Sequence, residues 1–264
     1  MTFQNKTVWI TGASSGIGEA LAYEFAKLGA HLVISSRNKT KLEEVKKRCD
    51  EYNVNCHIVI LDLSEEQNVI KAVNEVLKKK IKIDILIHNG GISQRSYAVE
   101  TPVKVDREIM ETNFFGSVVI TKSMLPVMIK QGGAHIVVVS SVVGKFGFPL
   151  RSAYSASKHA LQGFYESLRA ELASDNIPIT IVSPGRIVTN ISYNAVTHDG
   201  TKHGIMDEGQ AQGMSVEICA RKIIRSIRKN KKDVLIGNKE VLMVYIRKFL
   251  PGFFHKLAKK VKPT

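Results

Sequence analysis

The sequence lacks the features that mark several classes of protein. Its three cysteines, Cys49, Cys56 and Cys219, are odd in number and have no metal-ligand spacing. They predict neither a disulfide framework nor a zinc site, and they fit a reducing compartment. No stretch of about 18 uncharged apolar residues occurs, so we expect no membrane-spanning helix. The polar residues 1–6 run straight into an apolar segment. We therefore expect no signal peptide or N-terminal anchor, and a cytoplasmic location.

Carboxylates are scarce in one part of the chain. Residues 221–264 contain 14 lysines and arginines but only Asp233 and Glu240, so they carry most of the net charge of +14. The remainder is nearly neutral. A partner attracted by charge is expected to meet the C-terminal segment. The segment contains no recognised DNA or RNA module, and we expect no nucleic-acid partner.

Short apolar segments alternate with amphipathic ones along the chain. Strands are predicted at residues 7–11, 31–36, 56–61, 83–87, 136–139, 179–182 and 234–237. Helices are predicted at residues 39–53, 65–80, 102–131 and 152–173, the third bent at Pro126. Because no linker or repeat divides the chain, residues 1–264 are expected to form one domain. The alternation predicts an α/β fold with a single Rossmann-type, doubly wound parallel sheet, helices on both faces and a C-terminal helical extension.

A glycine-rich turn follows the first predicted strand and precedes a helix that ends near Gly29. Its glycines allow a pyrophosphate to approach the backbone, and the helix N-terminus offers unpaired N–H groups. The spacing Gly-x-x-x-Gly-x-Gly departs from the common dinucleotide form, but its position between a strand and a helix favours nucleotide binding. The predicted binding residues are Gly12, Ser14, Ser15, Gly16, Ile17 and Gly18.

The end of the second predicted strand indicates which nucleotide binds. An acidic residue there would bind the ribose 2′-hydroxyl of NAD. This chain instead has Ser36 and Arg37, with no carboxylate before Glu43. A 2′-phosphate would be attracted there, so we expect NADP(H) in preference to NAD(H).

Residues 140–158 contain the groups needed for proton transfer. Tyr154 and Lys158 are four apart in a predicted helix, and Ser141 follows a predicted buried strand. A tyrosine hydroxyl titrates near about 10 and needs its anion stabilised to act at neutral pH. An ammonium about 4 Å away would supply about 4 kcal/mol at an effective dielectric of about 20, or about three pKa units. Ser141 could hold the substrate oxygen.

These motifs resemble the short-chain dehydrogenase/reductase family over roughly residues 6–237. The resemblance implies that Asn113, Ser141, Tyr154 and Lys158 are catalytic, with Asn113 holding a water that links Lys158 to solvent. It implies hydride transfer between nicotinamide and a substrate carbon, and a homodimer or homotetramer. It also implies further cofactor contacts, which are Asp62, Leu63, Asn89, Gly90, Tyr154, Lys158, Pro184, Gly185, Ile187 and Thr189.

Two departures from the family pattern are informative. Gly90 replaces the usual alanine, and with residues 92–96 and the C-terminal extension it makes the chain similar to the member-seven branch of dehydrogenase/reductases. The animal members of that branch carry an N-terminal membrane anchor, which we do not expect here. Ser15 stands where many NADP-preferring relatives have lysine or arginine, so the predicted cofactor preference depends on Arg37.

The basic extension, residues 240–264, carries two apolar stripes. One contains Leu242, Tyr245, Ile246 and Phe249, and the other contains Phe254, Leu257 and Val261. The stripes could pack on the body or cover the substrate cleft, or they could make a peripheral contact with anionic lipid.

The segment before the extension gives one further expectation. Residues 190–213 have no firm periodicity and are predicted to form a mobile substrate lid. His198 and His203 in it are expected to be solvent-exposed and not to bind a metal.

The predicted function is therefore that of an NADP(H)-dependent oxidoreductase. Its substrate is expected to be an apolar carbonyl or secondary alcohol such as a steroid, a retinoid or another lipid-like compound, as Phe146 and Phe148 indicate. Two alternatives remain open. One is a 3-oxoacyl-carrier-protein reductase, whose acidic carrier could dock on the basic patch. The other is a non-catalytic dinucleotide sensor or scaffold on the same fold.

Overall fold

The centre of the molecule is a parallel sheet of seven strands. The structure is a computed structural model and describes residues 2–258. The strands lie in the order β3-β2-β1-β4-β5-β6-β7 and all neighbours pair in parallel. Their bounds are β1 Thr7–Thr11, β2 His31–Ser36, β3 Cys56–Ile60, β4 Ile85–His88, β5 His135–Val139, β6 Ile179–Pro184 and β7 Asp233–Ile236. The predicted doubly wound fold is confirmed.

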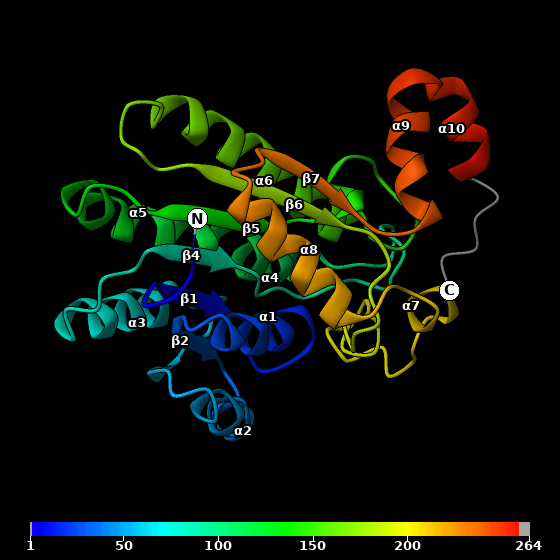
Figure 1. The fold of residues 1–264 in the computed structure, drawn as a ribbon. Helices are drawn as coiled ribbons and strands as arrows, with labels where there is room; N and C mark the ends of the chain where they lie inside the picture. Colours follow the sequence, from blue (N-terminus) through cyan, green and yellow to red (C-terminus); the bar gives the residue numbers. More distant parts are fainter. Residues whose placement is uncertain (1, 259–264) are drawn as a thin grey trace.

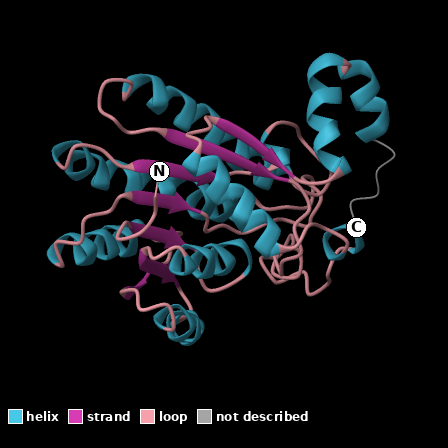
Figure 2. Cartoon of the chain, viewed as in Figure 1, coloured by secondary structure: helices cyan, strands magenta, loops and turns pink. Residues whose placement is uncertain are grey.

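Helices cover both faces of the sheet (Figures 1 and 2). The first group packs on one face and consists of α1 Gly16–Lys27, α2 Lys39–Asp50 and α8 Val216–Arg228. The second group packs on the other face and consists of α3 Glu66–Lys78, α5 Gly116–Lys130 and α6 Ser152–Glu171. The remaining helices are α4 Val103–Met110, α7 Glu208–Ala211, α9 Leu242–Phe249 and α10 Pro251–Ala258.

The alternation of side chains along each strand produces two cores. In β1, Val8 and Ile10 face the α1 side, whereas Trp9 faces the α3 and α5 side. All three are fully buried, as expected for a strand covered on both faces. The Trp9 indole N–H donates to the Ser35 hydroxyl at 2.8 Å, which satisfies its one polar group inside the core.

The strand order reverses between β1 and β4. The chain runs outward from β1 through β2 to β3, and then returns to β4 on the opposite side of β1. In an open parallel sheet, the loops on either side of such a reversal diverge and leave a crevice at the carboxyl ends of the strands. The glycine-rich turn after β1 and the Asn89-Gly90 turn after β4 both lie at this point.

The long helix predicted at residues 102–131 is present as one span, Val103–Lys130, which contains a π-helical turn. Helices α4 and α5 are continuous through one π-helical turn, Glu111–Phe115, while Pro126 lies inside α5. The span Val103–Lys130 is long and apolar enough to cross a membrane by length and composition alone, but half of its most apolar window is buried in the protein. It therefore serves as a helix of the core.

The two apolar stripes of the C-terminal extension have different surroundings. On α9, Leu242, Tyr245 and Phe249 are exposed. On α10, Phe254 is buried and packs on Phe146 with ring centroids 5.3 Å apart. Leu257 is half-buried, and Val261 lies outside the described residues. The extension thus packs on the body through Phe254, and the exposed residues of α9 form an apolar face. Both helices lie beyond β7 (Figure 1).

Candidate active site

The glycine-rich turn after β1 and the turn after β4 are in direct contact. The Asn89 amide donates to the carbonyl oxygens of Thr11 and Gly12 at 3.0 and 3.2 Å. Gly12 has a φ of +66°, and a Cβ there would lie 2.6 Å from the Cα of Gly90. A Cβ at Gly18 would lie 2.3 Å from the Gly12 carbonyl oxygen. Only glycine fits at these two positions, and the bare backbone leaves a cradle in front of α1.

Gly90, where alanine is usual in the family, has a local explanation. A Cβ at this position would lie 2.5 Å from Cδ1 of Leu63. Leu63 therefore occupies the space that an alanine methyl group would need.

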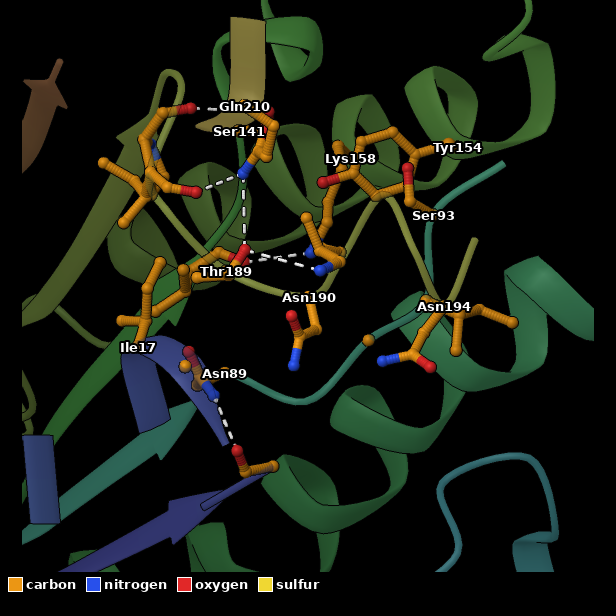
Figure 3. Close-up of a pocket in the computed structure, with 18 of the residues that line it drawn as sticks. Ile17, Asn89, Ser93, Ser141, Tyr154, Lys158, Thr189, Asn190, Asn194 and Gln210 are labelled. Carbon is orange, nitrogen blue, oxygen red and sulfur yellow. Dashed lines mark hydrogen bonds between the residues drawn. The ribbon is translucent and has the colours of Figure 1, made fainter. Parts of the chain in front are cut away.

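A cleft of about 1640 Å³ runs along the carboxyl edge of the sheet. Of the predicted site residues, all but Gly18 and Asn113 line it. Gly18 lies beneath the glycine-rich turn, and Asn113 lies behind Gly91. The close-up in Figure 3 shows Ile17, Asn89, Ser141, Tyr154, Lys158 and Thr189 around this space.

The Ser141 hydroxyl faces the Tyr154 hydroxyl closely enough to influence the pKa of the tyrosine, and it donates to the Pro184 carbonyl oxygen at 3.4 Å. Burial raises the pKa of Tyr154, while the Ser141 hydroxyl and the positive charges of Arg151 and Arg95 lower it, with burial prevailing. The expectation that Lys158 brings the pKa of Tyr154 near neutrality is therefore wrong for the cofactor-free protein. Its ammonium lies 5.8 Å from the centre of the tyrosine ring.

Lys158 is held at the bottom of the cleft. Its Nζ donates to the Val139 carbonyl oxygen at 3.0 Å, and the side chain is fully buried. Burial lowers the pKa of Lys158 to about 8. An ammonium has three donors, so Lys158 has further donor capacity for a polar group entering the cleft.

Asn113 joins two segments of the site from its position in the π turn. Its Oδ1 accepts from the Ile92 N–H at 2.8 Å, and its Nδ2 donates to the Ile92 carbonyl oxygen and the Ser157 hydroxyl, each at 2.9 Å. The side chain connects the loop after β4 to α6 one residue before Lys158. A π turn commonly marks a functional position.

The adenosine end of the cleft carries two cations. Arg37 is exposed, and its Nη1 lies 4.0 Å from Oδ2 of Asp62. Lys41, in the first turn of α2, lines the same end of the cleft. The sequence motif did not single out Lys41, although a lysine four residues after Arg37 on a helix start could have indicated it.

The segment after β6 is held by residues from two later elements. Glu240, at the start of the C-terminal extension, accepts from the Arg186 N–H at 2.9 Å, and a Cβ at Gly185 would collide with it. From α7, Gln210 donates to the Ile187 carbonyl oxygen and to the Thr189 hydroxyl (Figure 3). Neither Glu240 nor Gln210 was predicted from the sequence.

A buried polar network surrounds the first turn of α6. Gln94 is fully buried, and its Oε1 accepts from the backbone N–H groups of Ala153 and Tyr154 at 2.9 and 3.3 Å. Arg95 forms a buried ion pair with Asp207, which also binds Arg151 at 3.0 Å. The sequence draws attention to residues 92–96 only through the family resemblance, and Asp207 has no sequence signal at all.

The other end of the cleft is largely apolar. The C-terminal extension contributes Val241, Leu242 and Met243 to the lining. Facing them, the segment after β5 contributes Val142, Val143, Phe146 and Phe148. The extension thus covers the end of the cleft nearest Tyr154.

Residues 190–213 also line the cleft, through Asn190, Asn194 and Asp207. His198 is exposed and His203 half-buried, with Nε2 3.9 Å from Asp207. Within residues 2–258, no three His, Cys, Asp or Glu side chains gather in a way that could hold a metal ion.

Comparison with known proteins identifies the family. The family model for short chain dehydrogenase matches residues 6–200. A Xenopus laevis protein called dehydrogenase/reductase SDR family member 7B is 42% identical to this chain. The alignment covers 96% of this chain and 81% of that relative. The Bos taurus protein of that name is 44% identical to this chain, over 96% of this chain and 80% of that protein. An Anopheles gambiae protein called dehydrogenase/reductase SDR family protein 7-like is 45% identical to this chain, over 97% of this chain and 82% of that protein.

Solved structures agree on the fold. A short-chain dehydrogenase from Burkholderia phymatum in complex with NAD superposes with a TM-score of 0.84 at 22% identity, covering 100% of this chain and 98% of that one. A short-chain dehydrogenase from Sphingobium yanoikuyae in complex with NADPH superposes with a TM-score of 0.78 at 26% identity, covering 98% of this chain and 97% of that one. The chain therefore belongs to the short-chain dehydrogenase/reductase family, and its curated relatives lie in the member-seven branch to which its motifs point.

Proposed function

We propose that this protein is an NADP(H)-dependent oxidoreductase that interconverts an apolar carbonyl compound and its secondary alcohol, with Tyr154 as the general acid and base. The observation that carries the proposal is the convergence of Ser141, Tyr154 and Lys158 in the same cleft that the glycine cradle lines. Nicotinamide, when bound, supplies or accepts the hydride. This chain must therefore bind the cofactor, orient the substrate and move one proton.

Each residue has a defined part in the proton transfer. The Ser141 hydroxyl, which faces the Tyr154 phenol, would hold the substrate oxygen beside it. Tyr154 would give that oxygen a proton in reduction and remove one in oxidation. Lys158 would favour the tyrosinate through its charge and would bind the cofactor ribose, for which it has donors to spare. Asn113 would fix the backbone beside Lys158 and hold the water of the proton relay.

The cofactor residues fit a nicotinamide dinucleotide. The cradle left by Gly12 and Gly18 is closed to any side chain, and the N-terminus of α1 points its unpaired N–H groups at it. The preference for NADP(H) is supported by the charges at the adenosine end, where Arg37 and Lys41 line the cleft. A 2′-phosphate would find both cations within the same part of the cleft.

The apolar lining next to Tyr154 supports a lipid-like substrate. Val143, Phe146 and Met243 line this end of the cleft, and α9 continues from it with Tyr245 and Phe249 exposed. We further propose that α9 contacts an anionic membrane surface, with exposed Arg247 and Lys248 facing the headgroups. A substrate dissolved in lipid would then enter the cleft along the extension.

We also propose that the chain forms a homodimer or homotetramer through its long helices. Phe115, at the end of the π turn, is 44% exposed and continues an aromatic row with Phe114 and Phe164. An exposed aromatic residue on a long helix suits an interface between subunits. Light scattering of the wild type and of Phe115→Asp would test this proposal: equal masses that both correspond to a monomer would contradict it.

The catalytic proposal predicts the behaviour of Tyr154→Phe. Removing the hydroxyl should abolish reduction of a panel of apolar ketones and aldehydes, because the general acid is lost, while NADPH binding stays intact. Fluorescence titration with NADPH and turnover assays measure the two effects. A variant with a near-normal rate would remove Tyr154 from the mechanism.

The same assays separate the alternatives. Reduction of acetoacetyl thioesters in preference to the apolar panel would favour a 3-oxoacyl-carrier-protein reductase. Tight NADPH binding by the wild type without turnover of any substrate would favour a dinucleotide sensor.

A further inference from the structure

The buried ion cluster beside Tyr154 joins three distant segments of the chain. Arg95 lies in the loop after β4, Arg151 immediately precedes α6, and Asp207 immediately precedes α7. Arg95 donates through Nε to Asp207 Oδ2 at 3.1 Å and through Nη2 to the same oxygen, while Arg151 Nη2 reaches it at 3.0 Å. Arg95 and Asp207 are each only 6% exposed. One buried carboxylate therefore binds two guanidinium groups, that of the buried Arg95 and that of the half-buried Arg151.

The Asp207 carboxylate belongs to residues 190–213, the segment that lines the cleft. Residues 190–213 contact the loop after β4 through two backbone bonds, Val196 N–H to the Ser93 carbonyl oxygen at 2.9 Å and Arg95 N–H to the Val196 carbonyl oxygen at 2.8 Å, and through the buried Val196 side chain. If this segment moved away from the cleft, Asp207 would leave with it. The buried Arg95 would then lose the carboxylate that it binds through Nε and Nη2, which is unfavourable.

The cluster is also connected to the first turn of α6. Arg151 lies three residues before Tyr154 and is the N-cap of that helix. On the adjacent side, Gln94 next to Arg95 accepts from the backbone N–H of Tyr154. The position of the tyrosine backbone thus depends on a loop that Asp207 holds in place.

We propose that Asp207 is a positioning residue for Tyr154: when residues 190–213 cover the cleft, its carboxylate binds Arg95 and Arg151 and thereby fixes the first turn of α6. This inference rests on the proposed function of Tyr154, but it concerns a residue and a coupling that the function does not require. The closing of residues 190–213 over the substrate would then also orient Tyr154, the proton donor.

The charges around the tyrosine give the proposal a second consequence. The groups that face Tyr154 or its charged neighbours are Arg95, Arg151, Lys158, Arg186, His203 and Asp207. Asp207 carries the one negative charge in this set. Replacing its carboxylate by an amide would remove one negative charge from this set, and the tyrosinate would be favoured more strongly.

The test compares Asp207→Asn with Asp199→Asn in the full-length protein. Asp199 belongs to the same segment but is exposed and bonds only to Thr197 and Thr201, so it is a matched control. The first readout is the rate at which trypsin cleaves after the exposed Lys202 in the presence of saturating NADPH. Mass spectrometry measures this rate. The others are kcat, NADPH affinity and the pH dependence of ketone reduction.

For Asp207→Asn we expect faster cleavage after Lys202, unchanged NADPH affinity and a kcat lower by about 100-fold, since a displacement of about 1 Å costs that much. The alkaline limb of the pH profile should move to lower pH. Asp199→Asn should match the wild type in every respect. Arg95→Lys should keep part of the activity that Arg95→Met loses, because lysine retains the charge but not the bidentate geometry.

Three results would overturn the proposal. Cleavage at the wild-type rate would mean that Asp207 does not hold the segment closed. Faster cleavage with normal kcat would mean that closure is not coupled to Tyr154. A lower kcat with an unmoved alkaline limb would mean a general structural defect. Wild-type protein that binds NADPH but reduces nothing would instead overturn the proposed function, and the cleavage rates would still decide whether Asp207 closes the segment.

Discussion

Lys158 shows at the scale of one residue how a functional group destabilises the protein that holds it. Burial lowers its pKa to about 8 from 10.5, so at pH 7 the fold contains a buried ammonium that would be more stable in water. The shift corresponds to about 3 kcal/mol, partly offset by about 1 kcal/mol for the bond to the Val139 carbonyl oxygen. A bound cofactor would supply the missing acceptors.

We therefore expect Lys158→Met to raise the free energy of unfolding of the cofactor-free protein at pH 7 by about 2 kcal/mol and to abolish turnover. The advantage should shrink as pH rises from about 8 toward about 10.4, the pKa of an unfolded lysine. In that window the folded lysine is neutral and the unfolded one still binds a proton, so the wild type gains stability.

Urea unfolding at pH 7 and pH 9.5 measures this difference. Lys71→Met, on the exposed side of α3, is the control and should change little at either pH. A Lys158→Met variant less stable than the wild type at pH 7 would contradict the burial argument.

The proposed preference for NADP(H) depends on Arg37, and one substitution can test it. It is largely exposed and close to Asp62, so its removal should not disturb the fold. Arg37→Ala should weaken NADPH binding by about 10- to 100-fold, the value of one charge-assisted hydrogen bond, and leave NADH binding unchanged. Fluorescence titration with both cofactors is the measurement, with the exposed Lys47→Ala on α2 as control. Equal losses for NADPH and NADH would refute the assignment.

Local motifs made some site residues predictable and not others. Gly12, Tyr154 and Lys158 were predicted from local spacing, because the proposed chemistry uses neighbours along the chain. Asp207 binds Arg95 across 112 residues of sequence, and only the fold brings them together. The high pKa of Tyr154 could not be predicted either, since it depends on burial.

At the scale of elements, hydrophobic periodicity predicted the central strands well because β1, β2 and β5 are buried on both faces. β1 and β2 have the expected bounds. Periodicity did not reveal the π turn at Glu111–Phe115, because one extra residue per turn leaves the apolar pattern on either side almost unchanged. The turn follows from the contacts of Asn113, which the sequence does not encode locally.

Helix α9 carries the prediction that belongs to this scale. Its exposed residues Tyr245 and Phe249 lie four apart on one face, beside Arg247 and Lys248. We expect the protein to cosediment with phosphatidylserine-containing vesicles, less so at high salt, since screening weakens attraction between exposed charges. Phe249→Glu should weaken binding by at least about tenfold, because a buried phenylalanine contributes about 2 kcal/mol.

The control for α9 is Val99→Glu, which changes an exposed apolar residue far from the extension in sequence. It should pellet like the wild type. Removal of residues 240–264 is less informative than Phe249→Glu, because Phe254 packs on Phe146 and Glu240 binds the segment after β6. Equal pelleting of wild type and Phe249→Glu would contradict the membrane contact.

On the scale of the whole molecule, the central strands β4 and β5 lie in a buried part of the sheet. Two buried histidines lie in this region: His88 ends β4, and His135 begins β5. Each is bonded through Nε2 to a threonine hydroxyl, Thr121 at 2.7 Å and Thr180 at 2.8 Å. Burial lowers the pKa of His88 to about 3 and that of His135 to about 4. The folded protein therefore keeps both histidines neutral in mildly acidic solution.

This property predicts how global stability depends on pH. Below about 6.5 the unfolded chain binds protons at both histidines and the folded chain does not, so the free energy of unfolding falls as pH falls. The decline continues down to the folded pKa values of about 4 and about 3. Each histidine contributes up to about 1.4 kcal/mol per pH unit, and we expect a loss of about 2 kcal/mol between about pH 6 and about pH 5.

Urea unfolding between pH 7 and pH 5 tests this dependence above the range in which ordinary carboxyl groups titrate. His135→Asn should be less stable at pH 7, because the packing of β5 changes, but its stability should fall about half as steeply with pH. His198→Asn, at an exposed position, should keep the wild-type slope. If His135→Asn also kept that slope, His135 would be protonated in the folded protein, and the acid sensitivity would have to come from groups outside the central sheet.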